Sequence, residues 1–289
     1  MPPTPAPTMS DYPGLTALHP APAISVVTTV RNAERTLGRT IDSVARQTVP
    51  GLEYIVVDAC STDGTLDIIR ASSGVITHWI SEKDRGISDG FNKGIALSRG
   101  RYVALVNADD WLSDGQLSAG IQALESSGAD FAFGDLVYHD AAGKQLHRVT
   151  GDRDYARRIG YTMPALNHPT VIVRRTAYEQ HGLFDLKWRL AMDYELLLRF
   201  HRAGCRGIYE PRINGHMTLE GVSDRQGRAA LREVRDISIL HGFSPMAAQI
   251  RYGYALAKGR IRRTVEAVLP HDFSRAVRSF FNPDIASAG

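Results

Sequence analysis

The sequence Asn107-Ala108-Asp109-Asp110 follows a short apolar run and ends in two adjacent acids. Neighbouring carboxylates repel one another and are costly to desolvate, and a divalent cation relieves that cost. Hard cations prefer oxygen ligands and often combine one or two carboxylates with the phosphates of a substrate. The cluster therefore favours a metal site on a phosphorylated substrate. The alternative is a solvated turn or a cap for the helix expected near Ser113.

Asp58 ends a second apolar run, Leu52 to Val57. A carboxylate in that place can accept hydrogen bonds from a ribose or from the edge of a base. The alternative is a local turn in which the side chain bonds its own backbone. For Asp63, which precedes an expected helix, capping is as good an interpretation as ligand contact.

The stretch from Glu82 to Gly94 is dense in polar groups and glycines, which allow a close approach of the backbone to a ligand. Ile87, Phe91 and Ile95 recur at helical spacing, so they are expected to bury one face. The opposite face then turns three polar side chains toward a ligand, where basic groups can lie near anionic oxygens. These three are Asp89, Asn92 and Lys93. The alternative is an ordinary amphipathic helix with a charged face.

Three more residues could take part in chemistry, and each has a plain alternative. Asp193 begins an expected helix; as a general base it must come within about 3 Å of an acceptor hydroxyl, but an acid there also stabilises the helix dipole. His168 could hydrogen-bond an acceptor or a phosphate. His216 could close over a diphosphate or ligate the metal. A single histidine in a loop is more often an ordinary surface residue.

The elements that must position these residues alternate between strand and helix through residue 110. Apolar, β-branched runs predict strands at 24–29, 52–57, 75–80 and 102–106, with helices between them. Short connections of this kind require right-handed crossovers and a mostly parallel sheet. Ligands bind outside the carboxyl ends of such strands, so Asp58 and residues 107–110 are expected to meet in one crevice.

The second half of the chain is less regular. Strands are expected at 131–133, 136–139, 170–173 and 206–209, a helix at 191–203, a loop at 214–227, and two final helices at 228–240 and 245–268. The chain length of 289 residues is enough for one large domain. Residues 1–22 hold seven of the fourteen prolines and are interpreted as a disordered lead-in.

The composition excludes several classes of protein. A net charge of +3 is too small to indicate a nucleic-acid partner, and two cysteines, Cys60 and Cys205, are too few for a disulfide framework. No apolar run reaches the roughly 18 residues of a membrane span, and no signal peptide is recognisable. The cytoplasm is therefore the expected compartment.

The basic excess lies at the C-terminus, where the residues from Arg225 onward include eleven lysines and arginines and five acids. A basic amphipathic helix can lie on an anionic membrane surface, which would place the protein on the inner face of the cell membrane. The alternative is that its apolar stripe packs on the rest of the protein. The stripe comprises Ile250, Tyr254, Ala257, Ile261, Val265 and Val268, and the bases off it are Arg251, Lys258, Arg262 and Arg263.

Five motifs in order resemble the family 2 glycosyltransferases. Residues 24–32 (ISVVTTVRN) resemble the opening strand and donor loop, and residues 56–65 (VVDACSTDGT) the family's VDDGSTDGT turn. Residues 84–94 (DRGISDGFNKG) are similar to the DKGIYDAMNKG segment of a subgroup that builds exopolysaccharides and cell-surface glycans. Asn107-Ala108-Asp109 stands where the family has its DxD motif, and Met192-Asp193 where it has its ED pair.

The resemblance covers about residues 23–225 and implies a GT-A fold, a Rossmann-like, mostly parallel sheet in an α/β/α sandwich. It implies a nucleotide-binding half at 23–110, an acceptor-binding half at 111–225 and a basic helical extension at 226–289. By resemblance, Asp109 binds Mg²⁺ or Mn²⁺ on the donor diphosphate and Asp193 deprotonates the acceptor, so that the sugar is transferred with inversion. The implied donor-binding residues are Thr29, Arg31, Asn32, Asp58, Asp89, Asn92, Lys93, Asn107, Ala108, His168 and His216, the last also a metal ligand.

The implied donor is a UDP-, GDP- or dTDP-sugar, and the implied acceptor is a glycan or a lipid-linked glycan, while a homodimer is left open. Asn107, Ala59 and Met192 depart from the family pattern, as does the loop 217–223. Two other functions are therefore weighed. A sugar-nucleotide nucleotidyltransferase would have a glycine-rich loop after the first strand, and residues 30–34 contain no glycine. The other is a catalytically inactive module that binds sugar nucleotides.

Overall fold

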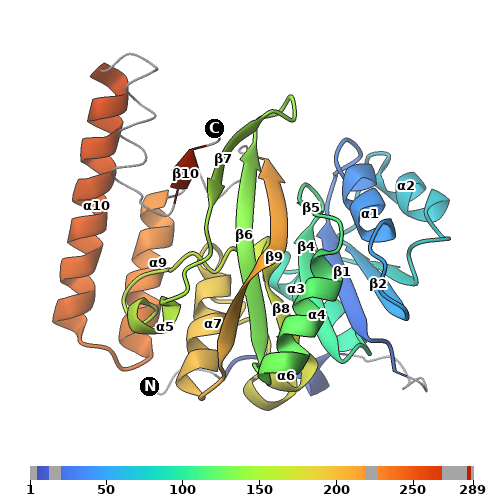
Figure 1. Cartoon of the computed structure of the whole chain (residues 1–289), viewed down its shortest axis with the longest axis horizontal. Helices are drawn as coiled ribbons and strands as arrows, with labels where there is room; N and C mark the ends of the chain where they lie inside the picture. Colours follow the sequence, from blue (N-terminus) through green and yellow to red (C-terminus); the bar gives the residue numbers. More distant parts are fainter. Residues whose placement is uncertain (1–4, 13–20, 219–226, 269–284, 288–289) are drawn as a thin grey trace.

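The sheet begins with four parallel strands, as the sequence predicts. The computed structural model describes residues 5–12, 21–218, 227–268 and 285–287, and in it the strands lie in the order β3-β2-β1-β4 (Figure 1). Parallel pairing joins β1 to β2 and β4, and β2 to β3. The carboxyl ends of β1, β2 and β4 therefore lie along one edge. These strands are β1 (Ile24–Val30), β2 (Leu52–Asp58), β3 (His78–Ser81) and β4 (Tyr102–Asn107).

Both faces of this sheet are covered, which explains why its strands are apolar without alternation. Along β1, Val27 packs in the hydrophobic core on the side of α3 and α7, whereas Val26 packs in the core on the side of α1, α2 and α4. Fully burying such a side chain stabilises the fold by about 1.5–3 kcal/mol. The helices are α1 (Leu37–Ala45), α2 (Thr65–Ala71), α3 (Ile87–Leu97), α4 (Gln116–Ser127) and α7 (Met192–Arg202).

A glycine lets α3 approach β1 closely. A Cβ added to Gly94 would lie 2.1 Å from Cγ1 of Val27, which is too close for any side chain at this position. One turn earlier, a Cβ on Gly90 would lie 2.9 Å from Cγ2 of Thr29. This close packing brings the N-terminal end of α3 next to the carboxyl end of β1.

The second half of the sheet differs from the sequence prediction in two strands. One strand, β6 (Phe131–His139), replaces the two expected at 131–133 and 136–139, and β9 (Gly207–Thr218) extends into the expected loop 214–227. The two pair in parallel through an irregularity at Gly134, where an added Cβ would lie 2.0 Å from the carbonyl oxygen of Ile213. Gly134 therefore permits a bulge within one continuous strand. Residues 219–226 lie outside the described residues.

The remaining strands extend the sheet. β8 (Ile172–Arg174) is antiparallel to both β4 and β6, β7 (Gln145–Val149) is antiparallel to β6, and β5 (Trp111–Leu112) is antiparallel to β9. β10 (Ile285–Ser287) pairs with β7. Short helices α5 (Tyr155–Arg158) and α6 (Arg175–His181) complete this half, with single turns η1 (Met9–Asp11) and η2 (His168–Thr170).

Two C-terminal helices, α9 (Gly227–Leu240) and α10 (Pro245–Val268), follow the predicted ranges closely. α9 contacts α7, and α10 contacts α9. In Figure 1 α10 is the outermost element, standing beyond α9 on the side away from the sheet. Within the described part of the chain, no helix is both long enough and apolar enough to cross a bilayer.

Part of the segment 1–22, which was expected to be a disordered lead-in, is folded. Residues 9–11 form η1, and Tyr12 is only 9% exposed. The carbonyl oxygen of Pro7 accepts a hydrogen bond of 2.7 Å from the backbone N–H of Leu183. A proline-rich composition predicts disorder when it has nothing to pack against, but here the tyrosine finds buried partners on α3.

Candidate functional site

One large cleft opens at the carboxyl ends of the parallel strands, with a volume of about 800 Å³. Such a volume is in the range of a cofactor-sized ligand. Five residues predicted for the donor line it, namely Thr29, Arg31, Asn32, Asn107 and Ala108, together with Asp109, which was predicted for the metal. The sequence also gave a reason to expect Asp63 there. The remaining lining residues are Val30, Ala33, Glu34, Arg35, Thr36, Ala59, Asp84, Gly86, Ile87, Tyr138, Met217 and Thr218.

The two adjacent acids occupy opposite environments. Asp109 is exposed and faces the cleft, whereas Asp110 is fully buried beneath it. Burial raises the pKa of Asp110 well above its usual value, and the nearby Asp109 charge adds to the rise. The sequence predicts two carboxylates that repel one another. The fold separates the two carboxyl groups, because Asp110 is buried and its pKa is raised, whereas Asp109 alone of the two lines the cleft.

Asn107 provides a second oxygen beside Asp109. Its Nδ2 donates a hydrogen bond of 2.8 Å to Oδ2 of Asp110, which fixes the amide. Its Oδ1 is buried and has no hydrogen-bond partner among the described residues. An unpartnered amide oxygen next to an exposed carboxylate suits a hard cation. The described residues hold no group of three or more histidine, cysteine or acidic side chains that could hold a metal alone, so phosphate oxygens would have to complete the shell.

The loop after β1 is held by the turn after β2. The side-chain Oδ1 of Asn32 accepts a hydrogen bond of 2.8 Å from the backbone N–H of Thr62, and the N–H of Asn32 donates one of 2.8 Å to Oγ of Ser61. Asn32 adopts a left-handed conformation (φ 51°), which asparagine tolerates better than most residues. Its amide oxygen thus shapes the cleft wall, while the exposed Arg31 and Arg35 supply positive charge at the cleft.

Asp58 has a different position from the one predicted. The side chain is fully buried and is not among the residues that line the cleft. Its carboxylate accepts hydrogen bonds from Oγ of Ser81 at 2.6 Å and from the backbone N–H of Ser61 at 3.1 Å. It therefore organises the turn that presents Ala59 to the cleft, and in this conformation it contacts no ligand space itself.

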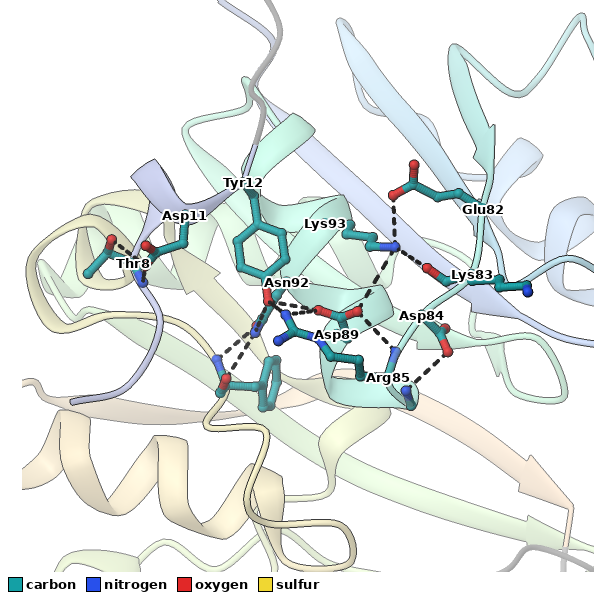
Figure 2. Close-up of polar contacts among 12 residues, drawn as sticks. Thr8, Asp11, Tyr12, Glu82, Lys83, Asp84, Arg85, Asp89, Asn92 and Lys93 are labelled. Carbon is teal, nitrogen blue, oxygen red and sulfur yellow. Dashed lines mark hydrogen bonds and ion pairs between the residues drawn. The ribbon is translucent and has the colours of Figure 1, made fainter. Parts of the chain in front are cut away.

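The polar side chains of α3 are engaged within the protein, as Figure 2 shows. Oδ1 of Asp89 accepts hydrogen bonds from the hydroxyl of Tyr12 at 2.9 Å and from Arg85 at 2.9 Å. Burial acts to raise the pKa of Asp89, but these bonds outweigh it and hold the pKa below its usual value. The Nζ of Lys93 pairs with Glu82 at 2.8 Å.

Asn92 is buried and forms paired hydrogen bonds of 2.9 Å with the backbone of Phe184. The prediction that Asp89, Asn92 and Lys93 line the cleft is therefore not supported by the structure. The reason is that the N-terminal segment and the loop at Phe184 cover the face of α3 that the sequence left open. Ile87, expected to be buried, is instead 43% exposed and lines the cleft.

His216 lies within a row of aromatic rings beside the cleft. Its ring stacks on Trp111 at 5.1 Å, and Trp111 in turn lies 3.6 Å from the guanidinium of Arg39. Its Nδ1 is 3.0 Å from Nε2 of His139, and its Nε2 is 2.8 Å from Oγ of Ser113. Both ring nitrogens are thus occupied, and a metal could bind Nε2 only if Ser113 gave up its hydrogen bond.

The hydrogen bonds around His216 assign a neutral ring. Nδ1 of His139 is 3.1 Å from the carbonyl oxygen of Gly143, which can only accept, so Nε2 of His139 must accept from Nδ1–H of His216. Burial lowers the pKa of His216 to about 4, and His139, Arg148 and Arg39 contribute through their charges. A second proton on His216 would add positive charge close to Arg39 and Arg148.

We expect His216→Gln to flatten the pH dependence of stability between about pH 4 and 6.5, the window set by the lowered pKa and the ordinary one. Below pH 6.5 the histidine binds a proton in the unfolded state but not in the folded state. The wild-type protein therefore loses stability as the pH falls. A neutral amide has no such dependence. Melting temperatures across the window test this, with His78→Gln on β3 as control. Equal slopes for wild type and H216Q would contradict it.

Asp193 and His168 line one small, mostly apolar cavity of about 10 Å³ beneath the sheet. This is about the least space that can hold a water molecule. Nε2 of His168 is buried without a hydrogen-bond partner in the described chain, and burial lowers the pKa of this histidine although the charge of Asp193 opposes the shift. His168 is therefore placed near Asp193 rather than in the cleft.

The helix that carries Asp193 adjoins the cleft through a single contact. Oγ of Ser88 lies 2.8 Å from the sulfur of Met192, the residue before Asp193. Ser88 follows Ile87, which lines the cleft. The first turn of α7 therefore lies directly behind the first turn of α3. Asp193 itself lines the small cavity and not the cleft.

Sequence reasoning missed several residues of the cleft wall. Tyr138, Met217 and Thr218 come from β6 and β9, which pair with each other and bring the second half of the chain to the cleft. Arg39 donates hydrogen bonds to the carbonyl oxygen of Asp109 and to Oγ1 of Thr218, and so joins both halves. Only the loop 217–223 has a counterpart in the family pattern, and Tyr138 and Arg39 are marked by no local motif, because their roles depend on long-range contacts.

Comparisons with known proteins agree with this geometry. The model of glycosyl transferase family 2 matches residues 25–182. A PGL/p-HBAD biosynthesis glycosyltransferase of Mycobacterium bovis is 27% identical over 186 residues, which are 62% of this chain and 70% of that protein. The succinoglycan biosynthesis protein ExoO of Rhizobium meliloti is 28% identical over 210 residues, which are 68% of this chain and 60% of ExoO.

Two solved structures share the fold. S. aureus TarS 1–349 in complex with UDP-GlcNAc superposes with a TM-score of 0.58 at 18% identity, covering 81% of this chain and 71% of that one. The mannosyltransferase PcManGT from Pyrobaculum calidifontis, in complex with GDP-Man and Mn²⁺, gives 0.59 at 16% identity, covering 97% and 84%. The chain spans 43% of the longer TarS structure.

Proposed function

The chain belongs to glycosyl transferase family 2, and we propose that it transfers a sugar, with inversion and with the help of a divalent metal, from a nucleotide-diphosphate donor to a hydroxyl of a glycan or lipid-linked acceptor. Its fold is the GT-A fold of the glycosyltransferases that it superposes on. The observation that carries the proposal is one cleft, lined by Asp109, Asn107 and the arginine-bearing loop after β1.

The charges of the cleft suit a sugar nucleotide diphosphate. Arg31 and Arg35 lie on the wall formed by the loop after β1, and Asp109 lies on the wall formed by the end of β4. A diphosphate can contact the guanidinium groups directly but needs a cation to lie beside a carboxylate. The solved structures with UDP-GlcNAc and with GDP-Man and Mn²⁺ support this arrangement by analogy of fold.

Asp109 and Asn107 are the residues of this chain that would hold the metal. They fit a hard cation because both present oxygen, one charged and one unpartnered. A cation bound there would neutralise the charge that develops on the leaving diphosphate. Arg39 fixes the backbone of Asp109 through its carbonyl oxygen at 3.0 Å and so holds the carboxylate at the cleft. His216 would join this set only after releasing Ser113.

Asp193 is the proposed general base. Its carboxylate would take the proton of the acceptor hydroxyl as the oxygen attacks the anomeric carbon, while the bond from that carbon to the diphosphate breaks on the opposite face. The displacement leaves an inverted glycoside, a nucleoside diphosphate and a protonated Asp193. His168 lines the same small cavity as Asp193, and burial lowers the pKa of this histidine.

The family assignment favours this function over a sugar-nucleotide nucleotidyltransferase. The names of the relatives, which refer to succinoglycan and PGL/p-HBAD biosynthesis, support a cell-surface glycan or glycolipid as acceptor. In this proposal residues 23–110 bind the nucleotide and residues 111–225 contribute the acceptor side. An inactive module that only binds sugar nucleotides is the second candidate, because Met192 replaces the acid beside the base.

A thermal-shift panel of UDP-, GDP- and dTDP-sugars, each with and without Mn²⁺, tests donor binding. At a donor concentration of about 100 times Kd the fold gains about 2.7 kcal/mol, which raises Tm by roughly 5 °C or more for a domain of this size. We expect one nucleotide to give this rise, and a larger rise with Mn²⁺ than without. If no sugar nucleotide changed the Tm of the folded protein under either condition, the proposal would fail.

A further inference from the structure

The outermost helix, α10, exposes an apolar stripe that nothing in the described structure covers. Met246 is 74% exposed, Ile250 66%, Tyr254 64% and Ile261 51%. Their spacing of four, four and seven residues keeps them on one face, because an α-helix has about 3.6 residues per turn. The sequence left open whether this stripe packs on the rest of the protein. Of the stripe expected from the sequence, Ile250, Tyr254 and Ile261 are exposed in the described structure, which favours a stripe that does not pack on the described part of the protein.

The opposite face of α10 makes the contacts with α9. Ala248 is 2% exposed, and the guanidinium of Arg235 on α9 lies 5.0 Å from the ring of Tyr252. Arg235 also donates a hydrogen bond of 3.3 Å to Gln249. Ala248 and Tyr252 each precede a stripe residue by two positions, which places them almost on the other side of the helix. The apolar stripe thus lies on the face of α10 opposite its contacts with α9.

Basic residues flank the stripe on both sides. Arg251 and Lys258 lie on one side of it and Arg260 on the other. No acid occurs between residues 245 and 265, and no ion pair is found for these three bases among the described residues. Side chains beyond Ile261, which include Arg262, Arg263, Val265 and Val268, lie outside the described set. The described part already combines an apolar centre with basic flanks.

We propose that this face of α10 docks the protein on an anionic lipid surface, with the apolar stripe entering the headgroup boundary and the flanking bases contacting lipid phosphates. Charge complementarity selects this partner. A second copy of the helix would bring arginines and lysines against one another, whereas an anionic bilayer attracts each base. α10 is not apolar enough to cross the bilayer, so it lies along the surface. This inference does not depend on the sugar or the metal.

Flotation of the full-length protein with vesicles tests the charge requirement. We expect binding to phosphatidylglycerol vesicles, weak binding to phosphatidylcholine vesicles, and loss of the difference in high salt. The triple variant R251E/K258E/R260E should lower the partition coefficient on anionic vesicles by at least roughly 100-fold, since each base contributes about tenfold or somewhat less. The matched variant R70E/K144E/R157E makes the same charge change at exposed positions on other elements and should bind nearly as wild type.

A second pair of variants tests the apolar stripe. I250S/Y254S removes its centre and should reduce flotation strongly, while M163S/L146S changes exposed apolar residues elsewhere and should not. The four variants alter exposed side chains and, at Lys258, a half-buried one, so unchanged melting curves are expected and confirm folding. Flotation that is equal on both lipids, or equally reduced by test and control variants, would overturn the proposal. So would sedimentation as a dimer that I250S/Y254S converts to monomer, because a second copy would then cover the stripe.

Discussion

Replacing Asp109 with asparagine is expected to abolish the Mn²⁺-dependent part of the donor-induced rise in Tm and to lower kcat/KM by roughly 10²–10³-fold. Asp109 bears this effect because it alone of the two adjacent acids lines the cleft, whereas Asp110 is buried and its pKa is raised well above its usual value. The cleft thus has a single carboxylate at the end of β4. Asparagine keeps the shape and an oxygen but removes the charge that attracts a divalent cation.

The measurement is a donor and Mn²⁺ titration of Tm beside steady-state kinetics. Asp114→Asn is a suitable control, because Asp114 is an exposed acid near the cleft that pairs with Arg46 on the surface. It should change neither quantity appreciably, since an exposed ion pair contributes little. If D109N kept the full Mn²⁺ increment, the metal would have to bind elsewhere, and the assignment of Asp109 would be wrong.

The second large effect is expected for Asp193→Asn, which should reduce kcat by roughly 10²–10⁴-fold while the donor still raises Tm as in wild type. The amide has nearly the same volume, and Asp193 accepts only the backbone N–H of Tyr194 at 2.8 Å, a bond that an amide oxygen can also accept. Folding should therefore survive. The proton of the acceptor hydroxyl would have no base to receive it.

Donor affinity and turnover together distinguish the candidate functions. A transferase loses kcat in D193N and keeps donor binding, whereas an inactive binding module has no turnover to lose in the wild-type protein. Asp67→Asn serves as control, because Asp67 is an exposed acid on α2 with only a surface partner. Unchanged kcat in D193N would remove Asp193 from the role of base, and loss of donor binding would assign it to the nucleotide site instead.

Helix α3 illustrates where local pattern succeeds and where it fails. The spacing of Ile87, Phe91 and Ile95 predicted a helix, and α3 spans Ile87–Leu97. Phe91 and Ile95 are buried as predicted, but Asn92 is also fully buried and Ile87 borders the cleft. Periodicity identifies a face that packs, but it cannot detect a segment more than seventy residues away, such as Tyr12, that covers the other face.

The sequence by itself determined the parallel strands, the order of the elements and the position of Asp109, because each follows from local hydrophobic runs and the residue that ends them. Only the tertiary structure decided that Asp110 is buried with a raised pKa, that Asp58 bonds its own turn, and that His216 is held by His139 and Ser113. The physical reason is that protonation and hydrogen-bond partners depend on solvent exclusion and on distant chain segments. Neither quantity is encoded in the spacing of neighbouring residues.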